Sequence, residues 1–135
     1  MVAVADGDTI TVLDNTNTQH KIRLAGIDAP EKKQAFGNVS KKSLSDMVYG
    51  KQVDIDWQKQ DRYGRMVGKV IVNGLDANLE QIKRGMAWFY SKYQNELVID
   101  DRLSYLHAHE SAQAANVGLS VDKDPMAPWD FRKLR

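Results

Sequence analysis

The chain has 135 residues, of which 42% are hydrophobic and 27% charged, and these values exclude a disordered or low-complexity segment. It contains no cysteine, which excludes disulfides and thiolate chemistry. It has no apolar run long enough to cross a bilayer, so we expect no membrane partner. We expect one domain over residues 1–135, whose first residues already read as a strand, so that a longer N-terminus could have been trimmed.

The formal net charge of +1 is unevenly distributed along the chain. Residues 1–19 carry three acids and no Lys or Arg, residues 20–65 carry ten basic and six acidic residues, and residues 66–135 carry nine of each. The basic excess in the second segment could favour a polyanion, and it could equally be a solvated surface.

The periodicity of apolar residues predicts a mixed chain of short strands and helices. In chain order we predict a hairpin with strands at 9–13 and 18–25, a helix at 39–49, strands at 52–57 and 65–72, a helix at 78–84, a strand at 86–90, a helix at 96–116 and an irregular tail at 119–135. The fold class is therefore α+β, and the strand count favours a small five-stranded OB-fold barrel with about three helices. Apolar spacing places Val39 on the inner side of the first helix, and Ile99, Leu103 and Leu106 on one face of the last.

Two acids flank a glycine in Asp6-Gly7-Asp8-Thr9, directly before the first predicted strand. An Asp/Gly turn explains this pattern without any function. Alternatively, one of the acids supplies a hard oxygen ligand to a metal ion.

A second acidic turn, Asp28-Ala29-Pro30-Glu31, follows the strand that carries Arg23. Pro30 has a fixed φ and biases Ala29 towards an extended backbone, so the two carboxylates project from a stiff turn. Acids and a guanidinium at one strand end indicate a metal and phosphate site, or an ordinary salt-bridged turn.

A third segment, Asp61-Arg62-Tyr63-Gly64-Arg65, closes a polar loop and enters a strand. Arginine presents a planar fork of donors that can hold phosphate oxygens in two places. Arg23 and Arg65 could therefore hold one phosphate from two strands, and each alone could equally form a surface salt bridge.

These three segments, in this order and spacing, closely resemble the staphylococcal (micrococcal) nuclease, or thermonuclease, family. Further matching segments are Arg84-Gly85-Met86-Ala87-Trp88 and residues 125–132. The resemblance covers nearly the whole chain. It implies an OB-fold barrel with three helices that hydrolyses phosphodiester bonds in DNA and RNA with Ca²⁺, leaving 3′-phosphate ends.

The resemblance also assigns expected roles by position. Asp8, Asp28 and the Ala29 carbonyl correspond to the Ca²⁺ ligands, Glu31 to the general base on the attacking water, and Arg23 and Arg65 to the transition-state guanidiniums. Arg62, Tyr63 and Tyr93 correspond to the residues that contact the terminal phosphate and stack on the base. Single-stranded substrates, a monomer, and a secreted or periplasmic location are further expectations, the last of them from the resemblance alone.

The chain departs from the best-known family member in two ways. It is nearly neutral rather than strongly basic, and Ser91 stands where that member has a second tyrosine, a role that Tyr90 could take. We expect the bulky aromatic residues Trp57, Trp88, Phe89 and Tyr105 to be core rather than stacking residues. The alternative function is an OB-fold module that binds single-stranded nucleic acid without cutting it, although such a module is expected to lack one or more of the five acidic and basic site residues.

Overall fold

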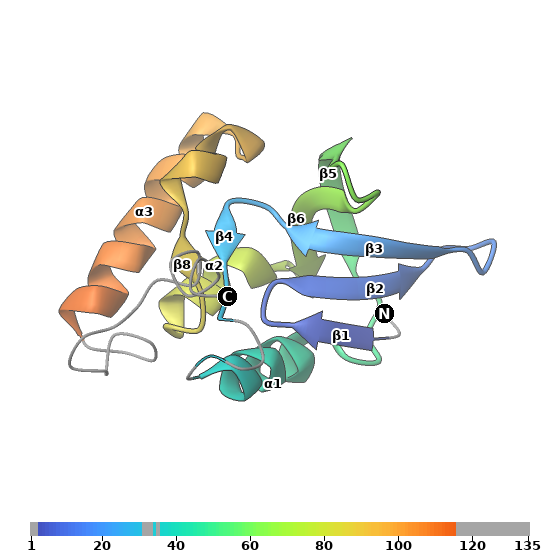
Figure 1. Ribbon diagram of the computed structural model, residues 1–135, viewed down its shortest axis with the longest axis horizontal. Coiled ribbons are helices and arrows are strands. Elements are labelled where there is room, and N and C mark those ends of the chain that lie inside the picture. The colour runs from blue at the N-terminus through green and yellow to red at the C-terminus, as the bar shows by residue number, and fades with distance from the viewer. Residues whose placement is uncertain (1–2, 31–33, 35, 116–135) are drawn as a thin grey trace.

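A computed structural model describes residues 3–30, 34 and 36–115 of the chain, and it has the expected α+β class (Figure 1). Its elements in chain order are β1 (Ala3–Asp6), β2 (Thr9–Leu13), β3 (Gln19–Leu24), β4 (Ile27–Asp28), α1 (Gly37–Val48), β5 (Asp54–Gln60), β6 (Met66–Val72), β7 (Leu75–Asp76), α2 (Ala77–Lys83), β8 (Trp88–Phe89), the 3₁₀ helix η1 (Ser91–Glu96) and α3 (Ile99–Ala114).

The main sheet has the strand order β1-β2-β3-β6-β5, with β7 paired to the end of β6. The hairpin predicted from alternation is present, since β2 and β3 pair antiparallel from Thr9↔Arg23 to Leu13↔Gln19. The β3–β6 pair is parallel, which brings two distant segments of sequence side by side. In the described residues β1 and β5 are the two edge strands, and the sheet curls into a half-barrel that agrees with the OB-fold expected from sequence.

The helices cover the half-barrel at one edge and one end. In Figure 1, α1 runs along β1, and α3 lies beyond the small β4–β8 sheet at the end of the molecule to which the β1–β2 turn points. Among the described residues, no helix is both long enough and apolar enough to cross a membrane.

Two buried side-chain amides connect these layers. Asn78 of α2 accepts a hydrogen bond from the Val70 backbone N–H at 3.1 Å and donates to the carbonyls of Ala25 and Gly68, each at 3.1 Å. Gln81, one turn later, donates to the Gly7 carbonyl at 2.8 Å. Because buried amides need partners, α2 fixes the positions of the β3–β4 and β1–β2 turns relative to each other.

The last predicted helix differs most from expectation. Its first residue belongs to η1, α3 begins only at Ile99, and the predicted end at 116 lies outside the described residues, as does the predicted tail at 119–135. The expected apolar face is wrong, because Ile99, Leu103 and Leu106 are exposed and Tyr105 is fully buried instead. The Tyr105 hydroxyl donates to the Asp76 carboxylate at 2.8 Å, and this anchor turns the opposite side of α3 inward.

Smaller differences concern α1 and β5. Helix α1 begins at Gly37 rather than at 39, and Val39 lies on its exposed side. Trp57 is 48% exposed, so the prediction that it belongs to the core is wrong, whereas Phe89 and Tyr105 are core residues as expected. Trp88 is partly buried, with its ring edge-on to His109 at 5.3 Å between centroids.

Candidate active site

Asp8 connects the β1–β2 turn to the end of β4. Its side chain is largely buried; Oδ2 accepts a hydrogen bond from the Ala29 backbone N–H at 3.0 Å, and Oδ1 accepts one from the Thr9 hydroxyl at 3.0 Å. Its own carbonyl accepts from the Leu24 backbone N–H at 2.8 Å. Asp28, which is 3% exposed, is the residue before Ala29. The structure therefore brings together Asp8, Asp28 and Ala29, the three metal ligands predicted from sequence.

Gly7 allows this acidic turn to pack closely against its neighbours. A Cβ atom at position 7 would lie 2.9 Å from the Cβ atoms of both Ser40 and Ala29. Such a contact is far shorter than van der Waals distance, so only glycine fits between the two acids. The side chains that require glycine at position 7 are therefore Ser40 of α1 and Ala29.

Asp6 is the second acid of the turn. Burial raises its pKa to about 8, and the neighbouring Asp8 carboxylate adds to the rise, while hydrogen bonds from the Asp8 backbone and Thr9 only partly oppose it. In the described residues, no Lys, Arg or His forms an ion pair with Asp6 or Asp8. A bound cation would favour the ionised form of Asp6 and would neutralise its charge.

The donor chemistry of this site fits a hard cation such as Ca²⁺, which prefers carboxylate and carbonyl oxygens. Over residues 3–30, 34 and 36–115, no three His, Asp or Glu side chains gather into a complete ligand set. The ligands predicted from sequence are two carboxylates and one carbonyl. This set is incomplete for Ca²⁺, so water or phosphate oxygens would fill the remaining coordination positions. Glu31, the predicted general base, lies outside the described residues.

Arg23 lies on β3, directly opposite Thr9 in the β2–β3 register, and is largely buried. Its Nη2 donates to Oε2 of Glu96 in an ion pair. Its guanidinium carbon lies 4.6 Å from the centroid of the Tyr93 ring, and Tyr93 in turn stacks on Tyr90 with 4.6 Å between centroids. The predicted base-stacking residue Tyr93 is therefore also a support for Arg23.

Arg65 lies at the end of the β5–β6 loop, immediately before β6. Its Nε donates to Oδ2 of Asp61 at 2.7 Å, and its guanidinium carbon lies 5.7 Å from the Tyr63 ring centroid. The Arg62 guanidinium approaches the same ring at 5.0 Å. Tyr63 itself is 69% exposed, so its ring is available to a ligand. The three predicted residues of this loop thus form one cation–aromatic cluster.

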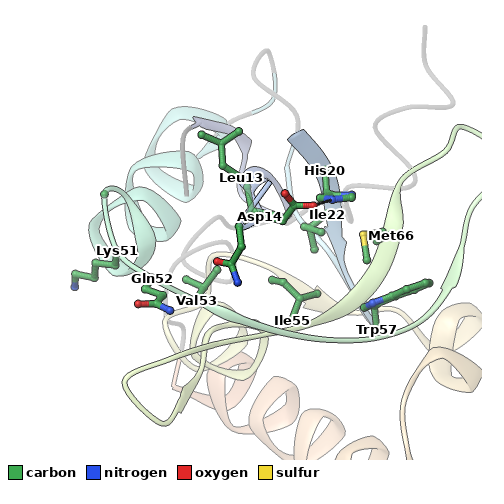
Figure 2. A pocket seen from close by; sticks show the side chains of 13 residues that line it. Leu13, Asp14, His20, Ile22, Lys51, Gln52, Val53, Ile55, Trp57 and Met66 are labelled. Carbon is green, nitrogen blue, oxygen red and sulfur yellow. Dashed lines mark hydrogen bonds and ion pairs between the residues drawn. The ribbon is translucent and has the colours of Figure 1, made fainter. Parts of the chain in front are cut away.

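The parallel β3–β6 register places the two arginines at the same end of the sheet. Ile22 pairs with Met66, and both line a cavity of about 670 Å³ on one face of these strands. Figure 2 shows Trp57 and Met66 close together at one end of this cavity, with Lys51 and Gln52 at the other. Neighbouring side chains of a strand point to opposite faces of the sheet. Because Ile22 lines the cavity, the next residue, Arg23, faces the other side of the sheet. This cavity is therefore separate from the candidate active site.

The family model for staphylococcal nuclease homologues matches residues 21–120, which is most of the chain. The chain belongs to the staphylococcal nuclease homologue family. The resemblance noted from three sequence segments is thereby confirmed. The matched span includes Arg23, Asp28 and Arg65, but it begins after Asp8.

Several relatives of this staphylococcal nuclease homologue align over almost its full length. A Haemophilus influenzae protein named "Uncharacterized endonuclease" is 45% identical over 133 residues, which cover 98% of this chain and 71% of that protein. A protein of the same name from Escherichia coli O157:H7 is 38% identical over 133 residues, covering 98% and 82%. The "Probable staphylococcal-like nuclease CAN1" of Oryza sativa subsp. japonica is 35% identical over 115 residues, covering 85% of this chain and 33% of its own length.

Sequence reasoning missed Glu96, the acid that pairs with Arg23. The two residues are 73 positions apart, and the family motifs that identified Arg23 do not include Glu96. Asp61 was recognised only as the first residue of its motif, yet its carboxylate is the partner of Arg65. For Arg23 only the packing of distant segments identifies the partner, whereas the Asp61–Arg65 pair lies within one loop and depends on the conformation of that loop.

Proposed function

We propose that this staphylococcal nuclease homologue is a Ca²⁺-dependent nuclease that hydrolyses phosphodiester bonds in DNA and RNA and leaves 3′-phosphate ends. The observation that carries the proposal is the convergence of Asp8 with Asp28 and Ala29, beside the strand that holds Arg23. Family membership and the nuclease names of the relatives support the same conclusion.

The carboxylates of Asp8 and Asp28 and the Ala29 carbonyl would hold Ca²⁺, which supplies fixed positive charge next to the phosphate when bound. Asp8 is buried and forms no ion pair with a Lys, Arg or His among the described residues, which supports this assignment. Asp6 lies beside Asp8, and although burial raises its pKa to about 8, a bound cation would favour its ionised form.

Arg23 and Arg65 would donate hydrogen bonds to the nonbridging phosphate oxygens, where negative charge grows as water attacks phosphorus. Both guanidiniums are held by carboxylates, Glu96 and Asp61 respectively, and are therefore oriented before substrate arrives. Each arginine uses only part of its five N–H donors in these ion pairs, and the remainder are free to bind phosphate.

Glu31 would accept the proton from the attacking water as its oxygen bonds to phosphorus. The bond from phosphorus to the 5′ oxygen breaks, this oxygen takes a proton from solvent water to become a 5′-hydroxyl, and the phosphate stays on the 3′ side. The preceding proline supports this role, because the fixed φ of Pro30 would limit the range of positions open to a carboxylate at position 31.

Exposed aromatic rings support a preference for single strands. Bases stack on aromatic side chains only when they are unpaired, and Tyr63 presents its ring to solvent between two arginines. Tyr93 and Tyr90 form a second stacked pair beside Arg23. We propose that the protein acts as a monomer on such strands.

The proposal is tested by incubating end-labelled single-stranded and duplex oligonucleotides, of DNA and of RNA, with either Ca²⁺ or a chelator. We expect cleavage only with Ca²⁺, fastest on single strands, and product ends that a polymerase extends only after phosphatase treatment. Cleavage that persists in chelator would contradict the role of the metal. Binding without cleavage under all conditions would favour the non-catalytic single-strand-binding module instead.

Two variants test the assigned roles. Glu31→Gln should lower turnover by about 10²–10⁴-fold with binding retained. Arg65→Ala should lower kcat by about 10²–10³-fold with a smaller change in KM. Arg84→Ala is the matched control, since Arg84 is exposed and pairs only weakly with Glu80. An effect of Arg65→Ala confined to KM would make Arg65 a binding residue.

A further inference from the structure

Glu96 is a buried acid at the centre of a small charge cluster. Its side chain is 5% exposed, its Oε2 atom pairs with Arg23, and the same atom lies 3.7 Å from Lys59 Nζ. Its other oxygen, Oε1, accepts a hydrogen bond from the Gly26 backbone N–H at 3.1 Å. Two cations thus share one carboxylate, and the cluster keeps one net positive charge.

We propose that Glu96 is a positioning residue, which orients Arg23 for the cleavage step. This inference rests on the proposed nuclease function, in which Arg23 must meet a phosphate with its donors already aimed. An arginine side chain has several rotatable bonds, and fixing it in advance removes the cost of ordering it during reaction.

The orientation of Glu96 does not depend on Arg23. The backbone N–H of Gly26 holds Oε1, and the next residue, Leu97, is buried against Gly26, where an added Cβ would lie 2.7 Å from Leu97 Cγ. Gly26 has a φ of +77°, a conformation that glycine adopts without strain. The backbone therefore presents a fixed carboxylate to the arginine.

Arg23 is constrained from a second direction by the same 3₁₀ helix. The Tyr93 ring stacks against its guanidinium at 4.6 Å, while Glu96 binds one end of the fork. The Arg23 guanidinium is planar, so contacts at one end and on one face fix the direction in which its other N–H groups point. Helix η1 thus supplies both contacts that aim Arg23.

A purely structural role for Glu96, as a link between η1 and β3, makes a different prediction from a positioning role. If Glu96 were only a structural link, its removal would lower activity to the same extent with and without Arg23. A positioning residue loses its effect once the side chain that it positions is removed. A double-mutant cycle separates these two cases.

The experiment measures kcat and KM for wild type, Glu96→Ala, Glu96→Gln, Arg23→Ala and the Arg23→Ala/Glu96→Ala double variant. We expect Glu96→Ala to lower kcat by about 10²-fold with little change in KM, because misplacing a catalytic group by about an ångström has that effect. Glu96→Gln should recover part of the loss, since its one remaining acceptor oxygen can still bind Arg23. In the Arg23→Ala background, Glu96→Ala should cause no further loss. The control Glu80→Ala, at an acid on α2 outside the site, should retain full activity.

Unchanged kcat in Glu96→Ala, or an equal loss with and without Arg23, would overturn the proposal. If Glu96→Ala fails to fold, Glu96→Gln against Arg23→Ala/Glu96→Gln completes the same cycle. A second readout needs no catalysis: NMR of the Arg23 guanidinium should show slowed rotation in wild type and free rotation in the Glu96 variants. Free rotation already in wild type would also overturn the proposal. Wild-type protein that cuts nothing would contradict the proposed function, and the NMR result would then decide on the positioning of Arg23 by itself.

Discussion

Asp61 holds Arg65 through its backbone and its side chain at the same time. Oδ1 accepts hydrogen bonds from the backbone N–H groups of Tyr63 and Arg65, at 2.9 and 3.0 Å, and Oδ2 accepts from Arg65 Nε at 2.7 Å. A backbone hydrogen bond from Asp61 to the Arg65 carbonyl, at 2.8 Å, completes the turn. One carboxylate therefore fixes both the loop and the guanidinium that the loop carries.

Asp61→Ala should lower kcat by about 10–100-fold, because Arg65 loses the partner that orients it, while Asp61→Asn should be intermediate since it keeps the acceptor for the backbone. Asp46→Ala, at an exposed acid paired with Lys42, is the control. Partial burial raises the pKa of Asp61, but hydrogen bonds from Arg65 and Tyr63 outweigh it and lower the pKa below 3.8. The contribution of this turn to stability should therefore be complete above the ordinary pKa and disappear as pH falls through the lowered value. Equal activity in Asp61→Ala and wild type would show that Arg65 needs no such support.

Asp6 should make the metal-free protein less stable as pH rises. Its pKa is raised from 3.8 to about 8, so between these values the folded state holds a proton that the unfolded state has released. Stability from this group is complete below the unfolded pKa and is lost as pH rises through the folded one. Thermal unfolding without divalent cations, compared at about pH 5 and about pH 8, should show a decrease in wild type that Asp6→Asn largely removes. The same decrease in both proteins would assign it to other groups.

Gly7→Ala should destabilise the fold by about 1–3 kcal/mol, because the new methyl group overlaps Ser40 and Ala29 in a packed region. It should also lower activity, since relief of the overlap moves the Asp8 turn away from Ala29. Urea unfolding measures the first effect and the cleavage assay the second. Asn38→Ala, on the exposed side of α1, is the control. Wild-type stability in Gly7→Ala would mean that the turn and α1 can separate without cost.

Tyr105→Phe should lower the free energy of unfolding by about 1.5–3 kcal/mol, the range for a hydrogen bond to a charged group. The lost hydroxyl donates to Asp76, a carboxylate whose pKa burial raises and which also caps the first turn of α2 through the Leu79 N–H at 3.0 Å. Tyr49→Phe is the matched control, because Tyr49 is exposed, and it should stay within about 0.5 kcal/mol of wild type. Equal stability of both variants would remove Tyr105 as the anchor of α3.

The parts of the fold that sequence predicts correctly have local causes. Alternation and turn residues define the β2–β3 hairpin, and glycines at 50 and 85 end two helices near the predicted positions. Oxygen donors in the Asp6-Gly7-Asp8 and Asp28-Ala29 segments suggest a shared metal ion, and the family resemblance assigns Asp8, Asp28 and Ala29 to it by position. Nothing local in either segment says that an Asp8 oxygen accepts a hydrogen bond from the Ala29 N–H.

The parts that sequence predicts incorrectly depend on tertiary contacts. The apolar spacing of Ile99, Leu103 and Leu106 indicated the buried face of α3, but the helix instead buries Tyr105, whose hydroxyl donates to Asp76. Trp57 alternates correctly on β5, yet it stands at a rim of the half-barrel where it stays exposed. Glu96 carries no motif, and its importance follows only from where η1 lies relative to β3.

The ion pair between Arg23 and Glu96 joins β3 to η1, at positions 73 residues apart in the sequence. A polypeptide emerging from the ribosome forms Asp8, Arg23, Asp28 and Arg65 long before Glu96 exists. Under the proposed function, the nascent chain therefore carries the acids and arginines of a nuclease without an aimed Arg23. Full cleavage activity would begin only when η1 packs against β3.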